Sequence, residues 1–258
     1  MKTFGDLTMR LHSWAWQLSG GLFFLGVWHF LASGSGSLAF ASPWETLAAA
    51  AGILTEKNFW FSGMLPTLCR VLVGFVLGII VGGGFGVCAG LFPGIALFLL
   101  PFRWILSSVP GVVLVILAML WCGVGSTMVV VIVALTVTPT IYLAMQEGIA
   151  TTDSNLCEMA RVYKLSCRKR LTEIYLPSVS ASLISACVIA LGGGMRVAIL
   201  GETLGMSQGL GYTLAMARAN LDTAGLYAVA LLSMLLVSVI EATFLRFIRK
   251  RVQRSEGI

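Results

Sequence analysis

Long apolar segments recur along this chain, and they constrain its fold more than any other feature. Five apolar blocks stand out, and the third, about 95–149, is long enough for two membrane spans. A membrane-spanning helix needs about 20 apolar residues, so the blocks predict six spans. The predicted spans are about 13–33, 63–91, 96–120, 125–147, 178–203 and 223–247. Because a helix satisfies its own backbone hydrogen bonds in lipid, we expect an all-α integral membrane protein.

The composition argues against the common classes of soluble protein. The 258 residues are 58% hydrophobic and only 11% charged, whereas about 25% of an ordinary soluble domain is charged. So few charged side chains cannot cover a water-facing surface. A soluble enzyme, a disordered regulator and a nucleic-acid reader are therefore disfavoured. The 29 glycines and 7 prolines suit a membrane chain, because both residues are tolerated inside spans.

The basic residues are distributed unevenly between the two sides of the membrane. If the N-terminus is inside, 13 of the 17 Lys and Arg residues fall in cytoplasmic segments, as the positive-inside rule requires. The exceptions are Lys57, Arg70, Arg196 and Arg218. We therefore predict that both termini are cytoplasmic. The net charge of +6 is then a topology signal and not a nucleic-acid footprint.

The predicted spans also define the organisation of the chain. The segments are a cytoplasmic N-terminus 1–12, a first span 13–33, a periplasmic loop 34–62, a core of five spans 63–250 and a cytoplasmic tail 251–258. A cleaved signal peptide is the alternative for the first block, since Lys2 and Arg10 precede it and Ala39-Phe40-Ala41 resembles a cleavage site. The block is longer than a usual signal core, which favours an uncleaved span.

Glycine recurs at every fourth position of the second span. The register is Gly74, Gly78, Gly82, Gly86 and Gly90. A spacing of four places these residues on one stripe of a helix, where another helix backbone can approach closely. Glycine is common in spans, but five in strict register favour tight helix packing.

The loop 150–176 is the most polar part of the chain, with eight charged residues. We expect one short helix to begin at Asp153 or Ser154, and a second to span 167–175 and end at Leu176-Pro177, where the fifth span begins. Connections between helices are usually short, so this long, charged loop favours a docking element for a cytoplasmic partner. The alternative is an amphipathic loop that lies on anionic lipid through its five basic residues.

Within this loop the sequence resembles a known family. Glu158-Met159-Ala160, followed after 13 residues by Ile174-Tyr175-Leu176-Pro177, resembles the EAA loop of ATP-binding cassette (ABC) import permeases. Met159 replaces the second-position Ala of the family pattern, and Lys164 stands where the family usually has Gly. Four other stretches agree in order and spacing: Ser42-Pro43, Thr67–Phe75, Leu120–Gly125, and Glu202 with Gly209-Leu210-Gly211-Tyr212. The resemblance covers about 42–250 and is closest to the nitrate, sulfonate and taurine permeases, a group that includes importers of thiamine precursors and riboflavin.

The resemblance implies a type I ABC importer permease fold with six transmembrane helices and a cytoplasmic coupling-helix loop. It implies a multi-pass protein of the bacterial inner membrane. It also implies a second permease copy in a homodimer, two cytoplasmic ATPase subunits, and a periplasmic or lipid-anchored substrate-binding protein. This chain would be non-catalytic and bind no cofactor, with ATP and Mg on the ATPase subunits. The implied ATPase-coupling residues are Asp153, Glu158, Met159, Ala160, Arg161, Lys164, Leu165 and Ser166.

Charged residues inside spans are functional candidates. One interpretation pairs Arg70 with Glu202 as a structural ion pair at the outer gate. Arg196 either faces the translocation path, where it would favour an anionic solute, or it reaches the interface or pairs with Glu202. Glu241 in the last span is expected to pair with the region of Arg246 or to reach water.

Two other classes of function remain as alternatives. A self-sufficient secondary transporter would carry an internal repeat and broken helices with ionisable residues at matching positions, which the sequence does not show. An intramembrane enzyme would need a nucleophile–base or metal constellation, and no such motif occurs.

Overall fold

The computed structural model describes residues 2–34 and 40–255, and within these residues it contains helices and turns but no strand. Ala39 of the possible cleavage site and the last residues of the predicted 251–258 tail lie outside the described residues. The chain divides into two units, one formed by 1–57 with 214–232 and one formed by 58–213 with 233–258.

The first unit contains two helices from the N-terminal part of the chain, α1 (Lys2–Gly34) and α2 (Pro43–Thr55). A capping box starts α2: the Ser42 hydroxyl accepts from the Glu45 N–H at 3.2 Å, and the Glu45 carboxylate accepts from the Ser42 N–H at 2.9 Å. The hydrogen bond from the Ser42 backbone lowers the pKa of Glu45. Helix α2 therefore has a defined start at Ser42.

Trp28 connects three segments of this first unit. Its indole N–H donates to the Ala41 carbonyl at 3.0 Å. Its ring stacks on Tyr227 with the centroids 5.9 Å apart. The indole thus links α1 to the start of α2 and to the first part of the last helix.

The second unit is built from the remaining helices. Their bounds are η1 (Phe59–Met64, a π-helical turn), α3 (Leu65–Leu91), α4 (Pro93–Ser108), α5 (Gly111–Cys122), α6 (Ser126–Ala150), α7 (Ser154–Val162), α8 (Cys167–Arg170), η2 (Leu171–Tyr175, a second π-helical turn) and α9 (Leu176–Gly205). The last two helices, α10 (Leu210–Ala219) and α11 (Thr223–Ser255), each contribute residues to both units.

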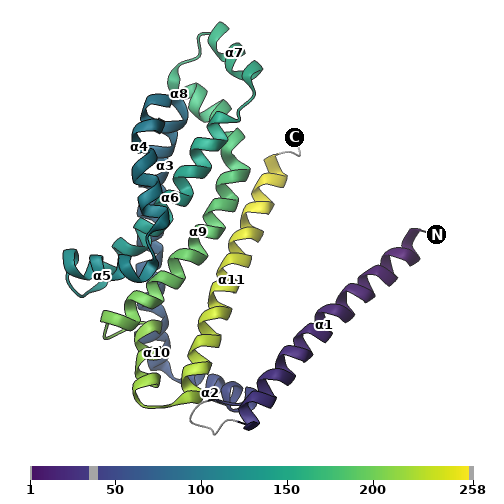
Figure 1. The fold of residues 1–258 in the computed structure, drawn as a ribbon. Coiled ribbons are helices and arrows are strands. Elements are labelled where there is room, and N and C mark those ends of the chain that lie inside the picture. The colour runs from purple at the N-terminus through teal and green to yellow at the C-terminus, as the bar shows by residue number, and fades with distance from the viewer. Residues whose placement is uncertain (1, 35–39, 256–258) are drawn as a thin grey trace. The chain divides into compact units, whose positions relative to one another are not determined.

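Helix α6 lies at the centre of the second unit, with α3 on one side and α9 on the other (Figure 1). Its core-facing side chains are completely buried, among them Ile132, Val133, Val137 and Ile141. Three residues of α11, Leu236, Val237 and Ile240, pack against this core. The fold is thus a layer of three long helices with α4, α5 and α11 around it.

Four described helical segments are long and apolar enough to cross a membrane: Phe59–Leu91, Ser126–Ala150, Arg168–Gly205 and Thr223–Thr243. The pair α4 and α5 makes a fifth if it is counted as one broken span. Helix α1 contains the predicted span 13–33 but is not among the segments that qualify. The structure confirms a multi-span helical protein, and the count of six spans stays a prediction.

The predicted span 96–120 is two helices and not one straight rod. Helices α4 and α5 meet at a bend of 104°. Val109, between them, has an extended backbone, with φ −71° and ψ 123°. The bend has a local cause, because proline disfavours helical geometry in the residue before it and Pro110 offers no N–H.

The predicted helix 167–175 does form, but it does not end at Leu176-Pro177. It continues through η2 into α9, so that Arg168–Gly205 is one helical segment. Pro177 stands directly after the π-helical turn η2, in the first turn of α9. Local π-helical adjustments of this kind let proline be tolerated inside a span, because they change which backbone groups pair. The loop 150–176 is therefore joined to a long core helix without a flexible break.

Candidate functional site

A buried ion pair joins α3 to α9. Arg70 Nη1 lies 2.6 Å from Glu202 Oε1, and the Glu202 side chain is completely buried. The arginine also donates to the Gln208 carbonyl at 2.9 Å and, through Nε, to the Ser126 hydroxyl at 3.1 Å. The structure thus places two of the four intramembrane charges that the sequence singled out against each other.

The second carboxylate oxygen of Glu202 is also satisfied. It accepts from the Thr67 hydroxyl at 2.7 Å and from the Gly211 N–H at 3.1 Å. Thr67 in turn accepts from the Leu210 N–H at 2.9 Å. A Cβ at Gly209 (φ +120°) would meet the Glu202 carboxylate, and one at Gly211 would meet the Ile199 carbonyl. Glycine is therefore needed in both places for the turn before α10 to close over the carboxylate.

This network acts as a structural joint and not as a solute contact. Glu202 has no accessible surface, and only 7% of Arg70 is exposed. Removing one partner of such a buried pair typically costs about 3–5 kcal/mol, because the other charge is left uncompensated. The pair fastens α3, α6, α9 and the start of α10 at one end of the bundle.

The glycine register of α3 faces α6. A Cβ on any of the five glycines would come within 2.5–2.7 Å of an α6 atom. Residues of α6 that advance by four along the chain meet successive glycines, in the order Val133, Val137, Ile141, Met145 and Ile149. Because both series advance in the same direction, α3 and α6 run parallel. Gly83 and Gly84, outside the register, have nothing within 4 Å.

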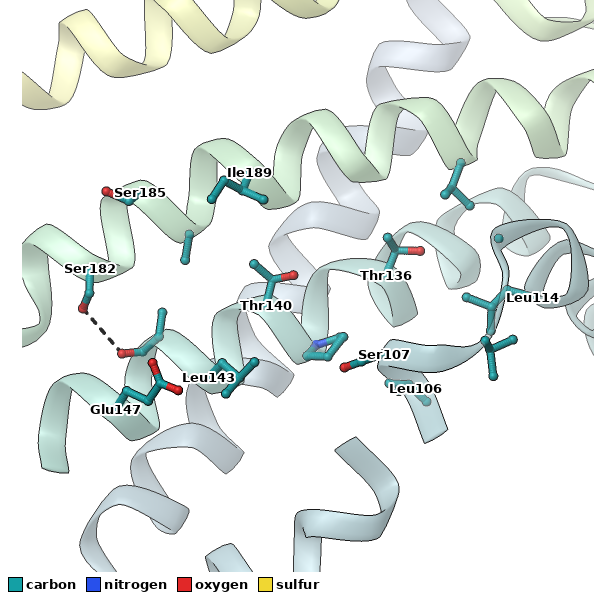
Figure 2. A pocket seen from close by; sticks show the side chains of 16 residues that line it. Leu106, Ser107, Leu114, Thr136, Thr140, Leu143, Glu147, Ser182, Ser185 and Ile189 are labelled. Carbon is teal, nitrogen blue, oxygen red and sulfur yellow. Dashed lines mark hydrogen bonds between the residues drawn. The ribbon is translucent and has the colours of Figure 1, made fainter. Parts of the chain in front are cut away.

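A cavity of about 560 Å³ lies between α4, α5, α6 and α9 (Figure 2). Five hydroxyl side chains line it together with one carboxylate: Ser107, Thr136, Thr140, Ser182, Ser185 and Glu147. Figure 2 shows that these groups come from α4, α6 and α9, with Glu147 at one end. Thr136 and Glu147 are eleven residues apart on α6, or about 16 Å at 1.5 Å per residue. The cavity is long enough for a small polar solute.

The hydroxyl groups of the cavity differ in whether they already donate a hydrogen bond to their own helix. Thr136 donates to the Ile132 carbonyl at 2.7 Å, and Ser185 to the Ala181 carbonyl at 3.2 Å. Ser182 donates to the Val179 carbonyl at 2.9 Å and lies 3.5 Å from the Ala144 carbonyl (Figure 2).

Within the part of the chain that the structure describes, the side-chain hydroxyls of Ser107 and Thr140 have no hydrogen-bond partner. Their hydroxyls are therefore free to donate to a solute.

Arg196 of α9 is exposed and is not itself one of the residues that line the cavity. Ser182, Ser185 and Ile189 line the cavity, and a spacing of seven residues puts Arg196 on the same helical stripe as Ile189. Its neighbour Val197 also lines the cavity. Arg196 does not join the Arg70–Glu202 pair, whose other partners are Thr67, Ser126, Gln208 and Gly211.

Helix α7, in the loop singled out by the sequence, has a defined start and end. The Asp153 carboxylate accepts from the Asn155 N–H at 2.8 Å, so Asp153 caps the helix. At the other end the Leu165 N–H donates to the Ala160 carbonyl at 3.0 Å, and Lys164 has φ +49°. This is a Schellman ending, with a lysine where glycine is preferred. Ser166 then starts α8 by accepting from the Arg170 and Lys169 N–H groups.

Helix α7 has one face toward the bundle and one toward the surroundings. Ala160 is 1% exposed, and the Cys157 thiol lies 3.8 Å from the Tyr175 hydroxyl. On the other face Met159 is 46% exposed and Tyr163 is 73% exposed. Leu156, Val162 and Glu158 are also exposed, and Arg161 lies in the same helix. The exposed face therefore combines apolar side chains with a carboxylate.

Sequence reasoning missed the cavity hydroxyls, because serine and threonine are frequent in spans and bond to their own helix. The usable signal was the spacing of Ser178, Ser182 and Ser185, which puts three hydroxyls on one face of α9. Sequence reasoning did not foresee that Glu241, expected to pair with the region of Arg246 or to reach water, lies against Gly192 of α9. No group of three metal-ligating side chains occurs within residues 2–34 and 40–255.

Comparison with known proteins agrees with this geometry. The family described as "Binding-protein-dependent transport system inner membrane component" matches residues 74–254. The "Putative aliphatic sulfonates transport permease protein SsuC" of Bacillus subtilis (strain 168) is 26% identical over 205 residues, 78% of this chain and 74% of that protein. The Escherichia coli (strain K12) protein of the same name is 34% identical over 118 residues, 46% of this chain and 45% of its own length. The "Taurine transport system permease protein TauC" of Escherichia coli (strain K12) is 23% identical over 185 residues, 70% and 67% of the two chains.

Solved structures show the same fold at low sequence identity. A chain of the MetNI methionine ABC transporter, in inward-facing conformations, superposes with a TM-score of 0.57 at 21% identity over 80% of this chain and 93% of that one. A chain of an amino acid ABC transporter with histidines gives a TM-score of 0.59 at 14% identity over 79% and 97%. The type I importer permease fold expected from the EAA-like loop is confirmed.

The family match covers more than half of the chain, includes the glycine register, the cavity and the loop with α7, and agrees with a multi-pass inner-membrane protein. This chain therefore belongs to the family of binding-protein-dependent transport system inner membrane components, the permease subunits of ABC importers.

Proposed function

We propose that this permease subunit imports a small anionic solute of the sulfonate, nitrate or taurine type, and that α7 couples it to cytoplasmic ATPase subunits. The family membership supports partners that hydrolyse ATP and that deliver substrate. The names of the relatives, sulfonate and taurine permeases, support the solute class.

The observation that carries the coupling proposal is the exposed face of α7. Leu156, Met159 and Tyr163 follow a spacing of three and four residues, so they form one apolar stripe. An apolar stripe with a polar rim is typical of a surface that docks a protein partner. Because the segment from α8 to α9 is continuous, a displacement at α7 passes directly to the helix that lines the cavity.

The cavity supports the proposed solute path. Its free hydroxyls at Ser107 and Thr140 donate hydrogen bonds, and the exposed guanidinium of Arg196 provides positive charge on the same side of α9. Donors and a cation suit an anion. The path in the assembly is completed by a second permease copy, with a binding protein outside and both termini of this chain in the cytoplasm.

The coupling proposal is tested by Glu158→Lys in the full chain, expressed with the ATPase and binding protein encoded beside it. Reversing a charge at an interface hot spot costs about 2 kcal/mol or more, which is about a thirtyfold loss of ATPase binding. We expect ATP-dependent uptake of labelled methanesulfonate to fall accordingly, with normal membrane insertion.

The matched control is Glu173→Lys, the same charge reversal at an exposed position of the same loop but outside α7. Uptake by this variant should stay close to that of the native chain. Equal uptake by both variants would argue against α7 as the docking element.

A further inference from the structure

Two opposite charges meet over a single glycine inside the spans of the second unit. A Cβ built on Gly192 would meet the carboxylate of Glu241 and would lie 3.5 Å from Arg196 Nη2. Both groups border the same gap between α9 and α11, within about 6 Å of each other, a range over which opposite charges stabilise each other. The juxtaposition depends on residue 192 having no side chain.

Neither of these two charged side chains is neutralised by a direct partner. Among the described residues, the side chains of Arg196 and Glu241 form no hydrogen bond or ion pair with each other or with another group, and the ion pair that does form joins Arg70 to Glu202. Charges within spans are costly and usually face a partner, a path or a water-filled cavity. The two opposite charges are thus close to each other, but no direct ion pair or hydrogen bond joins them.

Arg196 does not itself line the cavity, but its neighbour Val197 does. Arg196 is exposed and Glu241 is half-buried. Arg196 continues the α9 stripe of Ser182, Ser185 and Ile189, all of which line the cavity. A solute that moves along the hydroxyls therefore approaches the guanidinium, whose donors form a fork that matches oxyanions.

We propose that Arg196 is the residue that selects for an anionic group in the solute, and that Glu241 is its exchangeable counter-ion. Without solute, Glu241 compensates the charge of Arg196 across Gly192. An oxyanion on the solute takes over that role, bidentate on the guanidinium, and is released when Glu241 regains the arginine. This inference rests on the proposed function, because it requires that the cavity is the solute path.

The test measures anion binding by the full chain in neutral detergent, as the shift of its melting temperature with methanesulfonate at constant ionic strength. Dimethyl sulfone, a neutral analogue of similar shape, is the second probe. The Glu241→Gln variant should reach half-saturation at about one fifth of the native methanesulfonate concentration, because the competing carboxylate is gone. The Arg196→Gln variant should show no shift, Arg196→Lys should retain part of it, and dimethyl sulfone should act on none of them.

The matched control is Arg103→Gln, which removes a different arginine of the second unit, half-buried on α4. It should bind methanesulfonate like the native chain. The inference would be overturned if the native chain, Glu241→Gln and Arg196→Gln bound methanesulfonate equally. It would also be overturned if both variants lost the same amount of melting temperature while the shift caused by methanesulfonate stayed unchanged. A shift that requires added phosphatidylglycerol would overturn it too, by assigning Arg196 to a lipid phosphate. The proposed function fails separately, if the native chain shows no ATP-dependent uptake.

Discussion

Lys164 holds the backbone conformation that ends α7, with φ +49°. This left-handed conformation costs a residue with a Cβ about 1–2 kcal/mol, and glycine avoids the cost. The family pattern has glycine at this position, and the structure explains the preference, since the chain must turn there between α7 and α8. A lysine in this place leaves the turn formed but strained.

We therefore predict that Lys164→Gly stabilises the end of α7 by about 1 kcal/mol. Hydrogen exchange of the Leu165 amide, which bonds to the Ala160 carbonyl, measures this directly, and protection should rise about fivefold for 1 kcal/mol. Lys164→Ala is the control, because it removes the same charge and keeps the strain. Equal protection in both variants would show that charge, and not backbone geometry, sets the stability of the turn.

Single charged residues were partly predictable from the sequence. Arg70 and Glu202 each lie in a span without another obvious partner, and the structure brings them together. Glu241 was expected to pair with the region of Arg246 or to reach water. It is half-buried and lies against Gly192, a neighbour that hydropathy could not predict, because hydropathy does not fix how far one helix is shifted along another. The cavity hydroxyls are uncharged, so the distribution of charge in the sequence could not predict them.

The contact between α3 and α6 is the most regular element of the fold. In lipid, helix association depends on close packing, since the surrounding tails are as apolar as the side chains. Glycine at every fourth residue of α3 lets the α6 backbone approach, and β-branched or long side chains of α6 fill the space between. This contact holds the cavity-lining face of α6 in place.

The matched pair Gly82→Ala and Gly83→Ala tests this packing. A Cβ at Gly82 would lie 2.5 Å from the Thr138 carbonyl oxygen, whereas one at Gly83 has open space. Overpacking of this kind costs about 1–3 kcal/mol, so Gly82→Ala should lower the melting temperature of the purified permease. Gly83→Ala should leave it unchanged or raise it slightly, because alanine favours helix. A similar loss of melting temperature in both variants would contradict the glycine register as the packing contact between α3 and α6.

Helix positions followed from hydropathy, but helix breaks and continuations did not. Pro110 separates α4 from α5 by a 104° bend inside a predicted straight span. Pro177, in contrast, does not interrupt the segment Arg168–Gly205. Proline marks a place where a helix can change, and neighbouring packing decides whether it does.

For the whole molecule, the sequence predicted the fold class and the family, and the structure added how the helices are joined. The apolar blocks and the EAA-like loop predicted an all-helical importer permease. Only the packing shows that α6 lies between α3 and α9 and that it runs parallel to α3. Long-range neighbours are set by side-chain fit, which hydropathy does not encode.

We propose above all that this chain, a permease subunit of an ABC importer, holds its ATPase through α7. The most direct measurement is purification of the full chain by an affinity tag after expression with the genes beside it. The account predicts that an ATPase subunit co-purifies with the native chain and is lost from the Glu158→Lys variant. A native chain that is correctly inserted and never retains an ATPase would contradict the account.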